Sequence, residues 1–432
     1  MKRSIKKQTL ILTMANGIVR FLGMLMRIVL SRLMGAEIMG ITELSQSVHM
    51  LAITPLTSGL PLAVSRLTAK AAPRERTKPL EAGIAIVRTV SLIMIPLMIL
   101  LSPLLARMAG DLRVLPSLWF SAPCILILGY SAVYNGYCYG TEQSGLPAWS
   151  ELIEQTARLL LAFVILTTLR RLSAPWMAAV PVFSTMAAEI IGLFFVIGML
   201  KLPQSESAEL SRWTRPILQL ALPTTAARLV TTMLRALESI ILPKRLMASG
   251  LIRSEALSRL GMLNGMVMPL TLLPCIFTSA LSMVLVPRIA KEENDPQALK
   301  KLLFMSFLCC GFAGLLGYGA LFISAPLFAN LIFRLPELTE WLRMASPLAL
   351  IFPFAHVTGS VLASLGQQKR AVLGSIPVSI LTLALTWLLC AQPALRQKGV
   401  IIAQGAGQII LLLWNLLVLL LWFRKRNEDY SL

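Results

Sequence analysis

Four arginines lie within long apolar segments, and their type and spacing suit them to bind an anion. Arg20 and Arg27 lie in the first such segment, and Arg228 and Arg235 repeat the seven-residue spacing midway along the chain. Seven residues turn an α-helix through about 700°, so each pair projects from nearly one face as a two-level basic ladder. Guanidinium is always charged and binds phosphate through paired hydrogen bonds. The two pairs therefore predict a binding path for a phosphate-bearing anion.

These arginines need a polar environment. An arginine at the centre of a transmembrane helix costs about 2.5–3.5 kcal/mol on insertion scales, so we expect the four to face a water-filled cavity. The alternative is that Arg27 and Arg235 reach an interface while Arg20 and Arg228 pair with carboxylates. The first apolar segment contains no acidic residue, whereas Glu238 lies at i+3 from Arg235 and is placed for a local pair. Whether the second arginine pair faces the cavity or Glu238 stays open.

Three polar residues of the second apolar segment extend this predicted surface. Glu43, Gln46 and His49 follow at intervals of three, which places them roughly along one side of a helix. We assign them, with the arginines, to the substrate-binding surface. His49 has an alternative interpretation, in which it makes a hydrogen bond between helices rather than relaying a proton.

A charged run opens the fifth apolar segment and is a candidate gating or coupling site. It contains Glu151, Glu154 and Arg158, and the last two are four residues apart, a spacing that favours an intrahelical ion pair. The run is assigned either to structural pairing or to gating. Glu238 is a further coupling candidate.

Proline and glycine interrupt the second apolar segment. Pro55, Gly59 and Pro61 are candidate hinge residues, because backbone groups freed at such breaks can kink a helix or line a cavity. A tolerated kink without functional motion is the alternative.

The sequence predicts no catalytic site. It has no G-x-x-x-x-G-K-[ST] motif for nucleotide phosphates, and its six cysteines lack the spacing of metal ligands. We therefore expect no enzymatic activity, no metal and no cofactor. Coupling to Na⁺, to H⁺ or to the membrane potential stays open as the energy source.

The composition indicates which elements position these residues. Of 432 residues, 56% are hydrophobic and 14% are charged, against about 25% charged in soluble proteins, and the mean hydropathy is +0.75. Strands would leave backbone groups unpaired in lipid, so helices are expected. The sequence predicts an all-α, polytopic membrane protein with about twelve transmembrane helices in two six-helix lobes around a central cavity. We place the helices at about 9–34, 38–65, 83–106, 116–140, 150–169, 175–200, 216–243, 260–287, 302–326, 338–365, 372–391 and 400–423.

The net charge of +20 reflects membrane orientation rather than nucleic-acid binding. The basic residues lie in short segments between apolar runs and form no single stripe or tail. Segments predicted to be cytoplasmic hold about twice as many Lys and Arg as external ones when both termini are cytoplasmic, which satisfies the positive-inside rule.

An internal repeat predicts the domain organisation. A shift of 208 residues places Arg20 on Arg228 and Arg27 on Arg235, and a parallel repeat places its substrate site at the interface of the two halves. We divide the chain into an N-terminal lobe at 1–203, a polar cytoplasmic linker at 204–214 and a C-terminal lobe at 215–432.

Four short stretches carry a family resemblance: SRLMGAEIMG at 31–40, TSGLPLAVSR at 57–66, GYSAVYNGYCYG at 129–140 and SELIEQTAR at 150–158. With them the sequence resembles the stage V sporulation protein B group, within the polysaccharide biosynthesis proteins of the multidrug/oligosaccharidyl-lipid/polysaccharide (MOP) exporter superfamily. The resemblance implies two six-helix bundles, a V-shaped cavity entered by Arg20 and Arg27, and alternating access.

The resemblance also implies a substrate and a location. The expected substrate is an undecaprenyl-pyrophosphate-linked saccharide, such as a peptidoglycan precursor or polysaccharide unit, moved across the bacterial plasma membrane for spore cortex or cell-wall synthesis. Membrane lipid and cell-wall synthesis proteins are the expected partners, and nucleic acid is not. A cation-coupled multidrug antiporter with Glu43 or Glu238 as the coupling carboxylate is the alternative, and a non-transporting membrane scaffold is a third hypothesis.

Overall fold

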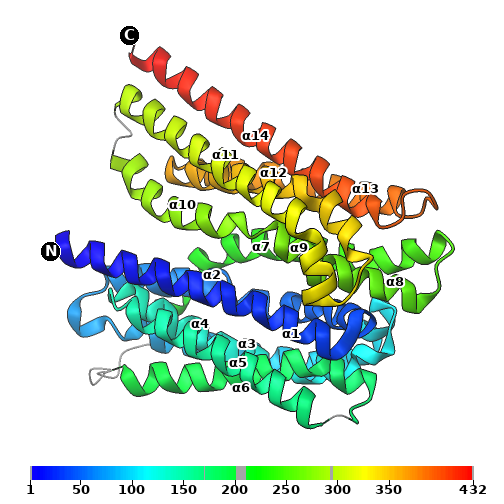
Figure 1. Ribbon diagram of the computed structural model, residues 1–432. Coiled ribbons are helices and arrows are strands. Elements are labelled where there is room, and N and C mark those ends of the chain that lie inside the picture. Colours follow the sequence, from blue (N-terminus) through cyan, green and yellow to red (C-terminus); the bar gives the residue numbers. More distant parts are fainter. Residues whose placement is uncertain (1, 170, 201–210, 292–294, 431–432) are drawn as a thin grey trace. The chain divides into compact units, whose positions relative to one another are not determined.

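The computed structural model describes residues 2–169, 171–200, 211–291 and 295–430, which are almost entirely helical (Figure 1). No strand occurs among these residues, in agreement with the predicted all-α class. The chain divides into two compact units, Met1–Ile240 and Ile241–Leu432. Most of the predicted linker at 204–214 lies outside the described residues, and the division into lobes at 1–203 and 215–432 stays a prediction.

The first unit contains six helices and the first part of a seventh. Two short 3₁₀ helices, Pro73–Glu75 and Leu112–Val114, precede the third and fourth of them. The α-helices are α1 (Lys2–Thr57), α2 (Gly59–Lys70), α3 (Lys78–Ala109), α4 (Leu115–Gly140), α5 (Gly145–Thr168), α6 (Ala174–Met199) and α7 (Ser211–Ala248), of which the part up to Ile240 belongs to this unit.

A sharp turn at Gly35 divides α1 into two limbs. Gly35 has φ 79° and ψ 170°, a conformation that is essentially restricted to glycine. Arg27 Nη1 and Glu43 Oε1, which lie at equal distances along the chain on either side of Gly35, are 3.0 Å apart. The limbs therefore fold back on each other as a helical hairpin (Figure 1). The turn falls between the helices predicted at 9–34 and 38–65.

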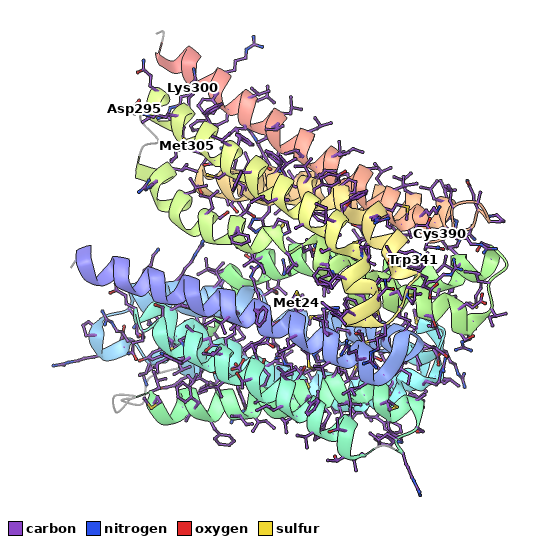
Figure 2. The ribbon with its side chains drawn as sticks, in the orientation of Figure 1. Met24, Asp295, Lys300, Met305, Trp341 and Cys390 are labelled. Atoms are coloured by element: carbon purple, nitrogen blue, oxygen red, sulfur yellow. The ribbon has the colours of Figure 1, made fainter. Side chains whose placement is uncertain are left out.

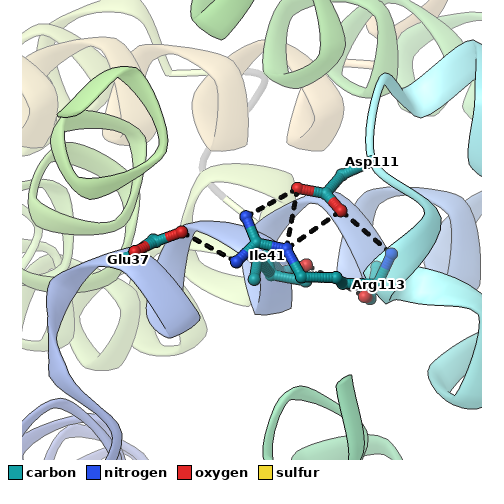
Figure 3. A network of polar contacts seen from close by, with 5 residues as sticks. Glu37, Ile41, Asp111 and Arg113 are labelled. Carbon is teal, nitrogen blue, oxygen red and sulfur yellow. Dashed lines mark hydrogen bonds and ion pairs between the residues drawn. The ribbon is translucent and has the colours of Figure 1, made fainter. Parts of the chain in front are cut away.

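A polar network fixes the second limb just beyond this turn (Figure 3). Arg113 donates hydrogen bonds to Glu37 at 2.8 Å and to Asp111 at 2.9 Å. Asp111 also accepts the backbone N–H of Arg113 at 2.9 Å, which caps the 3₁₀ helix Leu112–Val114. Because Glu37 lies two residues after Gly35, the network ties the hairpin turn to the connection between α3 and α4.

Helix α4 is central in the first unit. It packs against α1, α2, α3 and α6, and α5 packs against α1 and α6. Close approach of α4 to α2 depends on Gly136, where a Cβ would lie 2.5 Å from the backbone oxygen of Pro61. Small residues permit such contacts in membrane bundles, where packing rather than water drives association.

The second unit is also built around one helix, α12, which packs against α10, α11 and α14. Helices α4 and α12 correspond to the fourth predicted helix of each half, and the internal repeat itself stays a prediction. The elements of this unit are α8 (Arg253–Leu260), a π-helix (Gly261–Val267), α9 (Met268–Thr271), α10 (Pro274–Lys291), α11 (Pro296–Leu327), a second π-helix (Phe328–Phe333), α12 (Leu338–Ser364), α13 (Gln368–Leu389) and α14 (Lys398–Tyr430).

The outer surfaces of the helices are apolar as well as their interiors. On α11, which begins beside the labelled Asp295 and Lys300, Met305 is 52% exposed (Figure 2). Phe304 and Phe312 on the same helix are 68% and 67% exposed. Side chains of this kind on both inner and outer faces are expected of helices surrounded by lipid.

Among the described residues, eight helices are long and apolar enough to cross a membrane. They confirm a multi-span membrane protein, while the predicted number of twelve stays a prediction. Helix α5 is not among the eight because Glu151, Glu154 and Arg158 lie close together in it. The helix predicted at 260–287 is interrupted, since α9 ends at Thr271 and α10 begins at Pro274.

The turn at Gly35 gives the first testable prediction. A Cβ at this φ and ψ is strained, so Gly35→Ala should lower the stability of the purified protein by about 1–3 kcal/mol, measured as a lower thermal unfolding midpoint in detergent. Gly23→Ala is the matched control on the first limb, because no atom lies within 4 Å of its added Cβ. Equal midpoints for the two variants would contradict the strain.

Candidate functional site

A polar cavity lies within the first unit, between the second limb of α1 and the part of α7 before Ile240. Its volume is about 550 Å³, which is within the range of small-molecule sites. The lining residues recur every three or four positions on each helix, so each helix presents one face to the cavity. They are Glu43, Gln46, Ser47, Met50, Ile53, Thr54, Thr57 and Ser58, together with Thr224, Arg228, Thr231, Thr232, Arg235, Ala236 and Ser239.

Eight of these lining side chains carry hydroxyl groups. Several donate their proton to a carbonyl of their own helix, such as Thr54 to Met50 at 2.6 Å and Ser58 to Thr54 at 2.7 Å. The oxygens of these hydroxyls keep lone pairs and remain hydrogen-bond acceptors. The cavity wall is therefore suited to accept hydrogen bonds from the hydroxyl groups of a ligand.

The charges of the cavity are dominated by Arg228 and Arg235. Both line it, and no carboxylate in the described part of the chain forms a salt bridge with either. Glu238 is not a lining residue, so the structure places this arginine pair at the cavity. The third charged lining residue, Glu43, pairs with Arg27 at 3.0 Å. With that pair neutral, the cavity carries two positive charges.

The arginines of the first limb are placed differently. The carboxylate that neutralises Arg27 is Glu43, which lies on the second limb. The first apolar segment has no acidic residue, so its sequence gives no sign of this pair. Arg20 is exposed and does not line the cavity, and it lies within electrostatic range of Glu151 on α5. The four arginines assigned to one binding path are therefore in three different places. Arg228 and Arg235 line the cavity, Arg27 pairs with the lining residue Glu43, and Arg20 lies away from the cavity.

The remaining candidates form a second, buried polar cluster. His49 is 1% exposed, and its Nδ1 lies 3.1 Å from Ser121 Oγ on α4, which matches the interhelical hydrogen bond given as its alternative. It does not line the cavity beside Glu43 and Gln46. Arg158 does not form its salt bridge with Glu154, the partner predicted within the same helix. It lies 3.5 Å from Glu189 on α6 instead. Ser150 donates to the Glu154 carboxylate at 2.6 Å.

Glu189 is not part of any of the sequence motifs described above. It is the only charged residue in α6, and an isolated carboxylate in an apolar segment is itself a signal of function. Glu189 and Glu154 are each 7% exposed, so both carboxylates are buried.

The hinge candidates surround a break between α1 and α2. The helix is interrupted at Ser58, and the N–H of Gly59 donates to Thr225 Oγ1 on α7 at 3.2 Å. A Cβ at Gly59 would lie 2.2 Å from the backbone oxygen of Ala221. The break is therefore in direct contact with the helix that carries Arg228. Pro61 contacts α4, and Pro55 lies inside the last turns of α1.

A second cavity, in the second unit, has a different character. Its volume is about 820 Å³, and it is lined by apolar residues between Leu270 and Phe277 and between Leu308 and Phe328, with Ser324 and Cys309 as the exceptions. It has no charged lining residue, so it offers nothing to hold an anion.

Comparison with known proteins identifies relatives along nearly the whole chain. The sequence model described as "Polysaccharide biosynthesis protein" matches residues 5–293. Stage V sporulation protein B of Bacillus subtilis is 27% identical over 428 residues, covering 95% of this chain and 83% of that protein. Lipid II flippase MurJ of the same organism is 21% identical, covering 100% of this chain and 84% of its own.

Solved structures show the same fold. A multidrug resistance MATE family transporter of the MOP superfamily, in an inward-facing conformation, has a TM-score of 0.73 at 15% identity, covering 93% of this chain and 97% of its own. Lipid II flippase MurJ, in an inward closed conformation, also has a TM-score of 0.73 at 15% identity, covering 95% of this chain and 87% of its own. The predicted resemblance and MOP-like fold are confirmed.

The Arg27–Glu43 pair gives the second prediction. Glu43→Gln removes the negative charge from the cavity wall, so the purified protein should bind inorganic pyrophosphate roughly three- to tenfold more tightly, measured by titration calorimetry. Glu142→Gln, which makes the same charge change at an exposed position after α4, should leave affinity unchanged. Weaker binding by Glu43→Gln would show that Glu43 contributes to ligand binding directly.

Proposed function

Because this chain belongs to the polysaccharide biosynthesis protein family, a family of flippase-like membrane transporters rather than enzymes, we propose that it flips an undecaprenyl-pyrophosphate-linked saccharide across the bacterial plasma membrane by alternating access. The observation that carries the proposal is the polar cavity, with two positive charges and a hydroxyl-rich wall. Head groups of this class combine a pyrophosphate with sugar hydroxyls.

The charges of ligand and cavity match. A pyrophosphate esterified at both ends carries two negative charges, equal and opposite to those of Arg228 and Arg235. The arginines lie seven residues apart on α7, two turns of one helix face, so both long side chains extend from the same side of the cavity toward one pyrophosphate. The Ser and Thr oxygens then accept hydrogen bonds from the sugars.

The relatives support a particular saccharide and setting. Similarity to stage V sporulation protein B and to a lipid II flippase of Bacillus subtilis favours a peptidoglycan precursor used in spore cortex or cell-wall synthesis. Cell-wall synthesis proteins would then act on either side of the transporter. Both termini are assigned to the cytoplasm by the excess of Lys and Arg in the segments predicted to lie there.

A cation-coupled multidrug antiporter is the second candidate function. The MATE transporter with a TM-score of 0.73 favours it, and Glu43 is a carboxylate in the cavity wall. Against it, Glu43 is neutralised by Arg27, and two further arginines would repel a cationic drug. The charge of the cavity therefore favours the flippase.

The third prediction tests the arginine pair. Replacing Arg228 and Arg235 together by Ala should lower affinity for the lipid-linked saccharide at least about 100-fold, since each charge-assisted contact contributes about 1.5–3 kcal/mol. Flipping by the variant, measured with labelled lipid-linked precursor in proteoliposomes, should fall accordingly. Replacement by Lys should restore part of it, because charge returns without the bidentate geometry.

Arg171→Ala is the matched control, because Arg171 is exposed in the turn before α6. This substitution removes one arginine side chain and one positive charge, as each of the two cavity substitutions does. It should flip at the rate of the unaltered protein. Normal flipping by the Arg228→Ala, Arg235→Ala variant would contradict the proposed function. Drug efflux that depends on these arginines, without saccharide flipping, would favour the antiporter.

A further inference from the structure

Two arginines lie near each other at one end of the second unit. Arg259 is in the last turn of α8, and Arg396 is in the loop between α13 and α14. Both elements lie at the right-hand end of this unit in Figure 1. Among the described residues, neither guanidinium forms a salt bridge. Neither arginine lines the polar cavity of the first unit, so the pair is separate from the proposed transport path.

The charges around Arg259 are predominantly positive. Burial of the side chain lowers the pKa of Arg259, and repulsion by Arg396 lowers it further. Glu255 and Glu337 act in the opposite direction, and each of them acts less strongly than Arg396. Both carboxylates are exposed, where water and salt screen their charges. An anion placed between the two guanidinium groups would therefore relieve a repulsion that the protein leaves uncompensated.

Gln397 links the two arginines. It follows Arg396 in the loop, and its side-chain Oε1 accepts a hydrogen bond from Arg259 Nη1. Because a guanidinium group only donates, the amide oxygen must face Arg259, and the amide nitrogen keeps both of its protons for another partner. Three adjacent side chains therefore supply N–H donors at this position, which suits a ligand rich in acceptor oxygens.

Arg396 provides an independent observation. Its Nε is buried and has no hydrogen-bond partner among the described residues, and a buried N–H that bonds neither protein, water nor ion is costly. The backbone of Arg396 has φ 44°, a strained region for a residue with a side chain, and such strain is found chiefly at functional sites. The backbone N–H of Arg396 donates to the Gln392 carbonyl at 2.9 Å, which helps to hold the loop in this conformation. The loop thus presents a donor that an anion would satisfy.

This end of the second unit lies at the depth of lipid head groups. Trp387, near the end of α13, is exposed, and Arg245 lies 4.2 Å from the centre of its ring and donates to its carbonyl at 2.8 Å. Tryptophan and arginine side chains gather in this way where a transmembrane helix leaves the hydrocarbon. A Cβ at Gly399 would lie 2.7 Å from Leu389 Cβ, so the start of α14 packs directly on the end of α13. The short loop between these helices therefore stays at the same depth.

We propose that Arg259, Arg396 and Gln397 form a binding site for a phosphate group at the membrane surface, separate from the transport cavity. Guanidinium groups bind phosphate oxygens through paired hydrogen bonds, and phosphate supplies the negative charge that this end of the unit lacks. The phosphate belongs either to the head group of a phospholipid or to a soluble phosphate compound, since both present the same oxygens. When bound, it ties α8 to the loop between α13 and α14.

The next charged residue along the chain leaves this balance unchanged. Lys398 directly follows Gln397, and its Nζ lies 3.1 Å from the Glu340 carboxylate on α12. The two form their own salt bridge, so Glu340 is already paired with a cation other than the two arginines. The site therefore keeps its excess of positive charge.

The site is tested on the purified full chain carrying Arg228→Ala and Arg235→Ala, which removes the arginines of the transport cavity. After delipidation in detergent, this protein should bind inorganic phosphate, measured by titration calorimetry. Its thermal unfolding midpoint should rise with phosphate but not with sodium chloride of equal ionic strength. Arg259→Gln and Arg396→Gln should each weaken phosphate binding about tenfold or more. Arg343→Gln, which removes the same charge from an exposed position on α12, should leave binding unchanged.

Gln397→Glu separates loss of binding from loss of structure. A carboxylate at this position still accepts the hydrogen bond from Arg259 and also supplies a negative charge. The variant should therefore have an equal or higher unfolding midpoint while losing phosphate binding. Undiminished binding by this variant or by Arg259→Gln with Arg396→Gln would overturn the proposal.

The same titration in nanodiscs of phosphatidylcholine, a bilayer without net charge, identifies the source of the phosphate. Binding of inorganic phosphate in detergent that is lost in nanodiscs assigns the site to a phospholipid head group, whose own phosphate then occupies it. Binding retained in both media assigns it to a soluble phosphate compound. Absence of binding in both would overturn the proposal. No saccharide is flipped in these experiments and the cavity arginines are replaced, so their outcome is independent of the proposed function.

Discussion

The ion pair between Arg27 and Glu43 is the interaction on which the first unit depends. It joins the two limbs of α1 across the turn at Gly35, so it helps to fix the direction in which the second limb runs. That limb then presents Gln46, Ser47 and the residues after them to the polar cavity. The same pair neutralises the only carboxylate in the cavity wall, so Arg228 and Arg235 determine its net charge. One contact therefore contributes to both the geometry and the electrostatics of the site.

Much of this unit follows from local rules of sequence. The apolar segments predict the helices, the Pro and Gly residues around Ser58 predict the break between α1 and α2, and the seven-residue spacing of Arg228 and Arg235 predicts that both face one side. Each of these depends on residues close together in the chain, and the helical period transmits the information. The polar seam was predicted less well, because Gln46 lines the cavity whereas His49, three residues later, faces Ser121 on α4. A helix between two polar regions divides its polar residues among them.

The partners of the charged residues could not be predicted in this way. Arg158 has a carboxylate four residues before it in the sequence, yet its salt bridge is to Glu189, thirty-one positions further on. Isolated pairs on one helix contribute only about 0.2–0.5 kcal/mol, so the packing of α5 on α6 readily outweighs them. Arg27 illustrates the same point, since its carboxylate lies beyond a turn that depends on the backbone conformation of Gly35. Tertiary packing selects among partners that the sequence leaves equivalent.

The second limb of α1 connects the two polar regions of the first unit. One of its faces lines a cavity with two positive charges, and His49 on another face lies at a buried cluster with one negative charge in excess. The two regions therefore differ in the sign of their net charge. Gln46, which lines the cavity, and His49, which contacts Ser121, lie within one turn of this limb. A shift of the limb at one polar region would therefore be felt at the other, although their charged groups make no direct contact.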